Sequence, residues 1–308
     1  MGFYPSSVNN VLLVLTIDSR YRIWIHGCVE GFSRRIVWLE AHNNKRARTV
    51  RKIFERARQR FNAHPERVRC DKGRENVGIM FLMYLYNQNR ISKPVLAGRS
   101  IHNTRIERLW RDVHRVVGSR FKNIFESLEH SGELDLDDPL DLWVLHTIFL
   151  PIINRSLRTF QTTWDFHRSA SAQEKSPHHL YLEGLALQSV DGRFTEPVGN
   201  DYAIDPNEER PVELAAHEVD EGEEVEHIWE AGTMNDIEQL EASADEAASL
   251  RQEIQVPLWV RPHEGFGRID DLIFQYTPLA ATDGDDRVGI SCYRLLRNAI
   301  RAEFVRLE

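Results

Sequence analysis

The first part of the chain alternates short apolar runs with turn-like stretches. Residues 11–17 form an uninterrupted run of Val, Leu, Thr and Ile that ends at Asp18, and two further runs follow at 22–27 and 35–40, joined around residues 31–34. Short segments rich in β-branched and aromatic residues, bounded by turn residues, are typical of strands. The pattern predicts three consecutive antiparallel strands.

A change of period follows these strands. Apolar residues recur at helical spacing from Ala47 to Phe61, and His64-Pro65 should end that helix because the residue before a proline disfavours helical geometry. Residues 67–70 then suit a short strand that a helical crossover would make parallel to the first. Residues 75–89 are apolar and helix-like. The N-terminal region is therefore predicted to be α/β.

Helical periodicity dominates from about residue 103 to residue 167. One apolar stripe begins this region, and three more helices are predicted at 122–131, 141–149 and 152–167. Asp138-Pro139 offers a helix start, because Asp suits the cap and Pro suits the first turn. The members of the stripe are Ile106, Leu109, Trp110, Val113, Val116 and Val117.

Charge is distributed unevenly along the 308 residues. The formal net charge is −8, but residues 205–250 alone hold 16 Asp and Glu against one Arg, a local charge of −15. The rest of the chain carries +7. A mildly basic body remains compatible with a polyanionic partner, and the acidic stretch is typical of a solvated linker. We therefore predict a body over 1–185, an acidic linker over 186–253 and a small accessory segment over 254–308.

The cysteines and the first apolar run indicate in which compartment the protein is expected. Cys28, Cys70 and Cys292 are far apart and odd in number, which is a poor disulfide framework. The run at 11–17 is too short to span a bilayer and lacks the flanks of a signal peptide. We expect an intracellular protein with no membrane partner.

Three carboxylates lie at the ends of strands or on a helix, in positions that are common in phosphoryl-transfer sites. Asp71 follows the fourth predicted strand, Glu107 lies on a helix with 35 residues between it and Asp71, and Asp18 ends the first strand. Mg²⁺ takes oxygen ligands, and two such ions can activate an attacking oxygen and stabilise a leaving one. With 47 acidic residues in the chain the spacing alone is weak evidence, and Glu107 could equally form surface ion pairs with neighbouring arginines.

The sequence around these carboxylates resembles the integrase core domain proteins of fungi and some animals, transposon-derived relatives of retroviral integrases. The resemblance covers roughly residues 20–184 and rests on several short segments in order. These are Ile25-His26-Gly27, Gly31-Phe32-Ser33-Arg34, Asn43-Asn44-Lys45, residues 68–76 around Cys70-Asp71-Lys72-Gly73, residues 98–110 around His102-Asn103-Thr104-Arg105-Ile106-Glu107, and Ser176-Pro177-His178-His179-Leu180-Tyr181.

The resemblance implies an RNase H-like integrase catalytic core, a mixed sheet flanked by helices, followed here by a helical C-terminal flank and the acidic linker. It implies a polynucleotidyl transferase that uses Mg²⁺ or Mn²⁺ for DNA strand transfer, with Asp71, Glu107 and Asp18 as catalytic and metal-binding residues. It also implies a homo-oligomer and a nuclear location. Five basic residues surround Glu107 and suit DNA phosphates, although each also suits a solvated helix face. They are Arg99, Arg105, Arg108, Arg111 and Arg115.

The first carboxylate departs from the family pattern. In the family it lies further ahead of the Ile25-His26-Gly27 strand than Asp18 does. Either Asp18 serves through a shortened hairpin, or the first metal ligand is missing from this chain. The second alternative predicts a domesticated or decayed relative that is catalytically inactive and acts as a DNA-binding or interaction module. A first Asp that faces Asp71 would favour the enzyme.

Overall fold

The computed structural model describes most of the N-terminal two thirds of the chain and one C-terminal helix. For some of these residues it describes the backbone alone: 9–18, 97–98, 104–108, 187–191, 303–305, Asp71 and Asp286. The described residues are 9–62, 64–71, 73–87, 94–98, 104–168, 174–191, 239, 241–242, 273 and 286–305.

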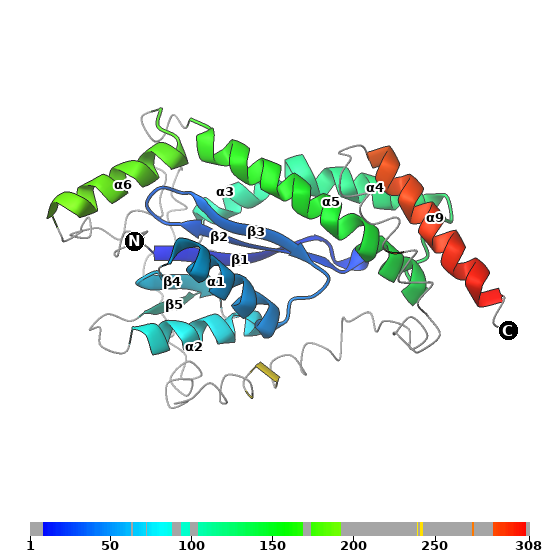
Figure 1. Cartoon of the computed structure of the whole chain (residues 1–308), viewed down its shortest axis with the longest axis horizontal. Coiled ribbons are helices and arrows are strands. Elements are labelled where there is room, and N and C mark those ends of the chain that lie inside the picture. Colours follow the sequence, from blue (N-terminus) through cyan, green and yellow to red (C-terminus); the bar gives the residue numbers. More distant parts are fainter. Residues whose placement is uncertain are drawn as a thin grey trace, which may run out of the picture.

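A five-stranded mixed sheet forms the centre of the molecule, in the order β3-β2-β1-β4-β5 (Figure 1). β1 is central; it pairs antiparallel with β2 and parallel with β4, and β5 is parallel to β4. The antiparallel order of the first three strands and the parallel fourth strand are confirmed. The strands are β1 (Asn9–Asp18), β2 (Ile23–Glu30), β3 (Ile36–His42), β4 (Arg67–Asp71) and β5 (Val95–Gly98).

Helices cover both faces of this sheet. α1 and α2 pack on one face, where they share a buried cluster with Cys28, Val68 and Cys70. α3, α4, α5 and α9 pack on the other face around a larger cluster. The helices are α1 (Ala47–Phe61), α2 (Val77–Tyr86), α3 (Thr104–Val113), α4 (Ser119–His130), α5 (Pro139–Phe166), α6 (Pro177–Asp191) and α9 (Asp286–Val305).

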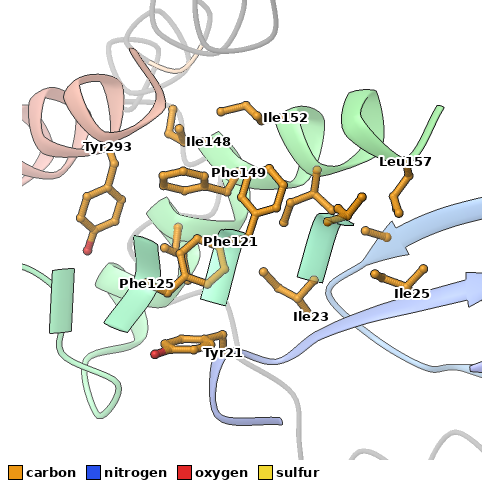
Figure 2. Close-up of a cluster of buried hydrophobic side chains, with 14 of the residues drawn as sticks. Tyr21, Ile23, Ile25, Phe121, Phe125, Ile148, Phe149, Ile152, Leu157 and Tyr293 are labelled. Carbon is orange, nitrogen blue, oxygen red and sulfur yellow. The ribbon is translucent and has the colours of Figure 1, made fainter. Parts of the chain in front are cut away.

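Aromatic rings hold the helical face of the molecule together (Figure 2). Phe149 of α5 lies edge-on to Phe125 of α4, with ring centroids 5.1 Å apart, and Phe125 lies 5.0 Å from Tyr21 at the end of the sheet. Tyr293 of α9 is fully buried beside Phe149. Offset and edge-to-face pairs of this kind stabilise a core beyond the area that they bury. The C-terminal helix thus belongs to the same core as the sheet.

α5 is one helix where the sequence predicted two. The prediction of separate helices at 141–149 and 152–167 is wrong, because Pro151 lies inside a continuous helix of 28 residues. Proline removes one backbone donor and usually bends or ends a helix. Here Phe149 and Ile152, on either side of it, are both buried in the same core, so packing outweighs the lost hydrogen bond. The predicted start is confirmed, since the Asp138 carboxylate accepts from the Leu140 N–H.

Two other elements differ from the sequence prediction. β5 was not predicted, because four residues give too little alternation to detect. α3 and α4 form one run of helix, joined by a π-helical turn at His114–Gly118 that rotates the apolar stripe. Val116 of that stripe is consequently 52% exposed, whereas Val113 and Val117 are buried.

A buried ion pair fixes α9 against α5. Asp141 has no exposed surface, and both its oxygens accept from Arg297, at 2.5 and 2.9 Å. Arg301 adds a contact of 3.1 Å, and the backbone N–H of Asp135 donates to the same carboxylate. A buried carboxylate needs this many donors, because its desolvation is otherwise costly.

A second buried ion pair joins the acidic stretch to α1. Glu241 is 2% exposed and accepts from Arg51 at 2.6 Å. Arg51 also contacts Glu55 one turn along its helix. A Cβ on Gly78 of α2 would lie against the Glu241 carboxylate, so this glycine leaves room for it. The acidic linker was predicted over 186–253, and its first six residues are the end of α6. Apart from residues 239, 241 and 242, the rest of it lies outside the described residues.

Among the described residues, no helix is both long and apolar enough to cross a membrane. Cys28, Cys70 and Cys292 are all buried as free thiols.

Candidate active site

Trp110 of α3 lies directly on Gly27 of β2. A Cβ built on Gly27 would be 2.5 Å from Cη2 of the indole, which leaves no room for any other residue there. Gly27 is the antiparallel partner of Leu13 in β1. Helix α3 therefore meets the sheet at the level of Leu13.

Asp71 belongs to the same face of the sheet. Side chains alternate between the two faces of a strand. Val68 and Cys70 of β4 are buried in the cluster with α1 and α2, so positions 69 and 71 belong to the opposite face, where α3 lies. Asp71 is the last residue of β4. The two elements that carry Asp71 and Glu107 thus share one face.

The strand register decides which residue of β1 stands beside Asp71. Val11 is the parallel partner of Arg69. Two residues further along each strand, this register sets Leu13 beside Asp71. Asp18 ends β1 five residues beyond Leu13, which corresponds to about 16 Å of strand at a rise of about 3.3 Å per residue.

Glu107 lies one helical turn before Trp110 in α3. Glu107 is therefore about 4.5 Å along the helix axis from the residue whose ring packs on Gly27. The side chains of Asp18, Asp71 and Glu107 lie outside the described part of the structure. The backbone therefore places position 71 and helix α3 on the same face of the sheet, and Asp18 further along β1.

Several residues of the resembling segments have positioning roles. His26 is buried on the α1 face and its Nε2 lies 3.0 Å from the carbonyl oxygen of Asn44, just before α1. Burial lowers the pKa of His26 to about 4, so the ring is neutral near pH 7 and Nε2–H is the donor. The Asn44 side chain in turn accepts from the Arg46 N–H and the Thr49 hydroxyl. This network fixes the start of α1.

Glu30 organises the turn between β2 and β3. Its buried carboxylate accepts from the backbone N–H groups of Phe32 and Ser33, at 2.7 Å each, and from the Ser33 hydroxyl. Burial raises the pKa of Glu30, and these donors oppose the rise. Arg34 adopts a positive φ of 62°, and its carbonyl accepts from Trp164 Nε1 of α5. The turn therefore anchors the far end of α5.

The five arginines predicted for DNA differ in how far the structure describes them. Arg99 lies outside the described residues, and Arg105 and Arg108 lie on α3 with side chains outside them. Arg111 is exposed, and Arg115 is exposed with a 2.9 Å contact to Asp112. At least Arg111 and Arg115 therefore remain accessible to a phosphate.

Sequence reasoning did not identify Gly27 and Trp110 as a contact pair, although both lie in the segments that carry the resemblance. The signal is the absence of a side chain in an otherwise apolar strand, which often marks a close approach of another element. Among the described side chains, no group of three potential metal ligands occurs.

The comparison with known families agrees with this architecture. A family model described as integrase core domain matches residues 15–193, more than half of the chain. No curated protein matches the chain. The family implies an RNase H-like fold, and a mixed sheet flanked by helices on both faces is consistent with it. The chain therefore belongs to the integrase core domain family.

Proposed function

We propose that the chain acts on DNA as a transposon-derived integrase core, a polynucleotidyl transferase in which Asp71 and Glu107 hold Mg²⁺ or Mn²⁺. The proposal is supported by the packing of Trp110 of α3 on Gly27 and by the alternation of β4, which assigns position 71 to the face of the sheet that α3 covers. Two carboxylates on rigid elements match the ligands that Mg²⁺ takes from a protein, with water and phosphate oxygens completing its shell. A bound divalent ion would supply activation of a hydroxyl nucleophile and neutralisation of phosphate charge.

The residues of this chain have distinct parts in that proposal. Asp71 and Glu107 supply hard oxygen ligands, and the packing of Trp110 on Gly27 holds α3 against the sheet. Arg111 and Arg115 present exposed guanidinium groups that position the phosphate backbone without reading sequence. The reaction is DNA strand transfer, in which a 3′-hydroxyl attacks a target phosphodiester and displaces a 3′-oxygen.

The strand register supports a second candidate function. Asp18 ends β1 about 16 Å of strand beyond the residue that stands beside Asp71, and that residue is Leu13. A site with two ions bridged by phosphate needs carboxylates at one level. The position that would complete it holds an apolar residue. This favours a catalytically inactive DNA-binding module that retains the fold and two of the acids.

Strand transfer on a short donor duplex, with Mg²⁺ or Mn²⁺ present, distinguishes the two candidates. If the parent protein is active, Glu107→Gln should reduce strand transfer to background while DNA affinity persists, because an amide cannot replace the charge that binds the ion. A parent that binds DNA but transfers no strand supports the inactive module. An active parent with an equally active Glu107→Gln variant would exclude Glu107 as a metal ligand.

A further inference from the structure

We propose that helix α1 carries a second surface for the phosphate backbone of duplex DNA, on the face of the sheet opposite α3. The surface consists of Arg48, Lys52, Arg56 and Arg60, here named the α1 basic row. It extends the proposed DNA-binding function to a new part of the molecule and rests on that function for the identity of the polyanion.

The α1 basic row is a continuous stripe of positive charge that winds slowly around the outer side of the helix. Its members follow one another at intervals of four residues, and all four are exposed. At 3.6 residues per turn and 1.5 Å per residue, neighbouring members are offset by about 40° around the helix, and the row spans about 18 Å along it. The opposite side of α1 is buried in the cluster that covers the sheet, with Val50, Ile53 and Phe54. The row therefore faces away from the sheet.

The charge of this helix is barely compensated. α1 holds six Arg and Lys and a single Glu, and that Glu55 contacts Arg51 outside the row. Arg56 contacts Glu40 at 2.6 Å, and Arg60 lies over the ring of Phe61. Within the described part of the chain, no carboxylate lies at ion-pair distance from Arg48 or Lys52.

Such a row is unfavourable on a helix whose outer side contacts only solvent. Exposed helices gain stability when acids and bases alternate at four-residue spacing, and like charges at that spacing cost roughly 0.2–0.5 kcal/mol per pair. Every four-residue step of the α1 basic row pairs two cations. A polyanion bound along the row would remove this repulsion, and Lys and Arg in line suit contacts to successive phosphates that carry no sequence information.

The row is separate from the candidate active site. α1 and α2 cover one face of the sheet, whereas α3 covers the other (Figure 1). Arg51, on the neighbouring side of α1, is not available to DNA, because it is buried against Glu241. DNA at the row would therefore be a second duplex segment, or a distant part of one that also reaches α3.

The salt dependence of DNA binding by the full chain tests this proposal. The test variant is Arg48→Gln/Lys52→Gln, and the swap Arg48→Lys/Lys52→Arg keeps the charge. Arg155→Gln/Arg158→Gln removes two exposed charges from α5 and is the matched control. Affinity for a short duplex of arbitrary sequence would be measured by fluorescence anisotropy over a range of salt concentrations.

The double Gln variant should bind more weakly at low salt, and the slope of log K against log salt should fall by about two, one unit for each lost phosphate contact. The charge-preserving swap should retain the parental slope, and the α5 control should change it much less. Unchanged or tighter binding by the double Gln variant would overturn the proposal. The acidic stretch of the chain itself would then be the better partner for the α1 basic row. A parent that binds no DNA would instead overturn the proposed function itself.

Discussion

Trp110 lies against Gly27 so closely that its indole occupies the space of any side chain at that position, 2.5 Å from where a Cβ would stand. This contact joins α3 to β2, which pairs with the central strand β1. It brings together two residues that are 83 positions apart and that both lie in segments carrying the family resemblance. Trp110 supplies the ring, and Gly27, which has no side chain, leaves the space that the ring fills.

Gly27→Ala should destabilise the protein by about 1–3 kcal/mol, the usual cost of overpacking a core. Urea unfolding gives the free energy of unfolding for the comparison. In a Trp110→Leu background the added methyl group should cost less, since the indole that it would meet is gone. If the cost of Gly27→Ala is the same in both backgrounds, the close contact is not its cause.

The register of β1 predicts which acids bind a metal. Asp71→Asn and Glu107→Gln should each weaken Mn²⁺ binding measured by calorimetry, because each removes a carboxylate ligand. Asp18→Asn should leave Mn²⁺ binding unchanged, because Asp18 ends β1 about 16 Å of strand beyond the level of Asp71. Weaker binding by Asp18→Asn would show that Asp18 reaches the site.

Leu13→Asp should place a third carboxylate beside Asp71. Position 13 pairs with Gly27, whose missing side chain faces α3, and directly opposed residues of an antiparallel pair share a face. We expect tighter Mn²⁺ binding by Leu13→Asp than by the parent. Leu15→Asp, two residues further along the same face, is the control, and an equal gain there would indicate that added charge rather than position is responsible.

Two buried histidines predict loss of stability in mild acid. His26 and His146 are both neutral in the fold, and burial lowers the pKa of each to about 4. In the unfolded chain each would take up a proton near pH 6.5. The free energy of unfolding therefore keeps the full contribution of both histidines above about pH 6.5. It falls as pH decreases toward 4, by up to about 1.4 kcal/mol per pH unit for each histidine.

Urea unfolding at pH 7 and pH 5 measures this effect. His146 Nε2 lies 2.7 Å from the carbonyl oxygen of Tyr21, and a glutamine amide can donate to the same oxygen. His146→Gln should therefore fold and lose about half of the pH dependence between pH 6.5 and pH 5. An undiminished slope would mean that other groups take up the protons.

Arg297→Ala should loosen α9 from the core. The substitution leaves the fully buried Asp141 with Arg301 and one backbone donor. Loss of the principal partner of a buried charge should cost a few kcal/mol, up to about 3–5 when no partner remains. Limited proteolysis should then cleave near α9 more rapidly. Arg294→Ala, which removes a half-exposed contact to Glu133, is the control and should have little effect.

Local pattern alone determined the N-terminal half of the fold and the resemblance. The runs that became β1, β2 and β3 and the helical spacing of α1 could be predicted because short β-rich runs and a helical period are local signals. The parallel β4 could be predicted because a helical crossover leads to it. Asp138 also marks the start of α5 through a contact that spans two residues. The domain boundaries, the site residues, the oligomer and the nuclear location remain predictions.

Only the tertiary structure decided how these elements meet. The continuity of α5 through Pro151 depends on core contacts from both of its halves, and the burial of α9 depends on Asp141, 156 residues from Arg297. The distance between Asp18 and Asp71 depends on how β1 slides against β4, since any shift of register changes which residue of one strand faces the other. A sequence gives each strand its pattern, but register is fixed by contacts between strands that are far apart in the chain.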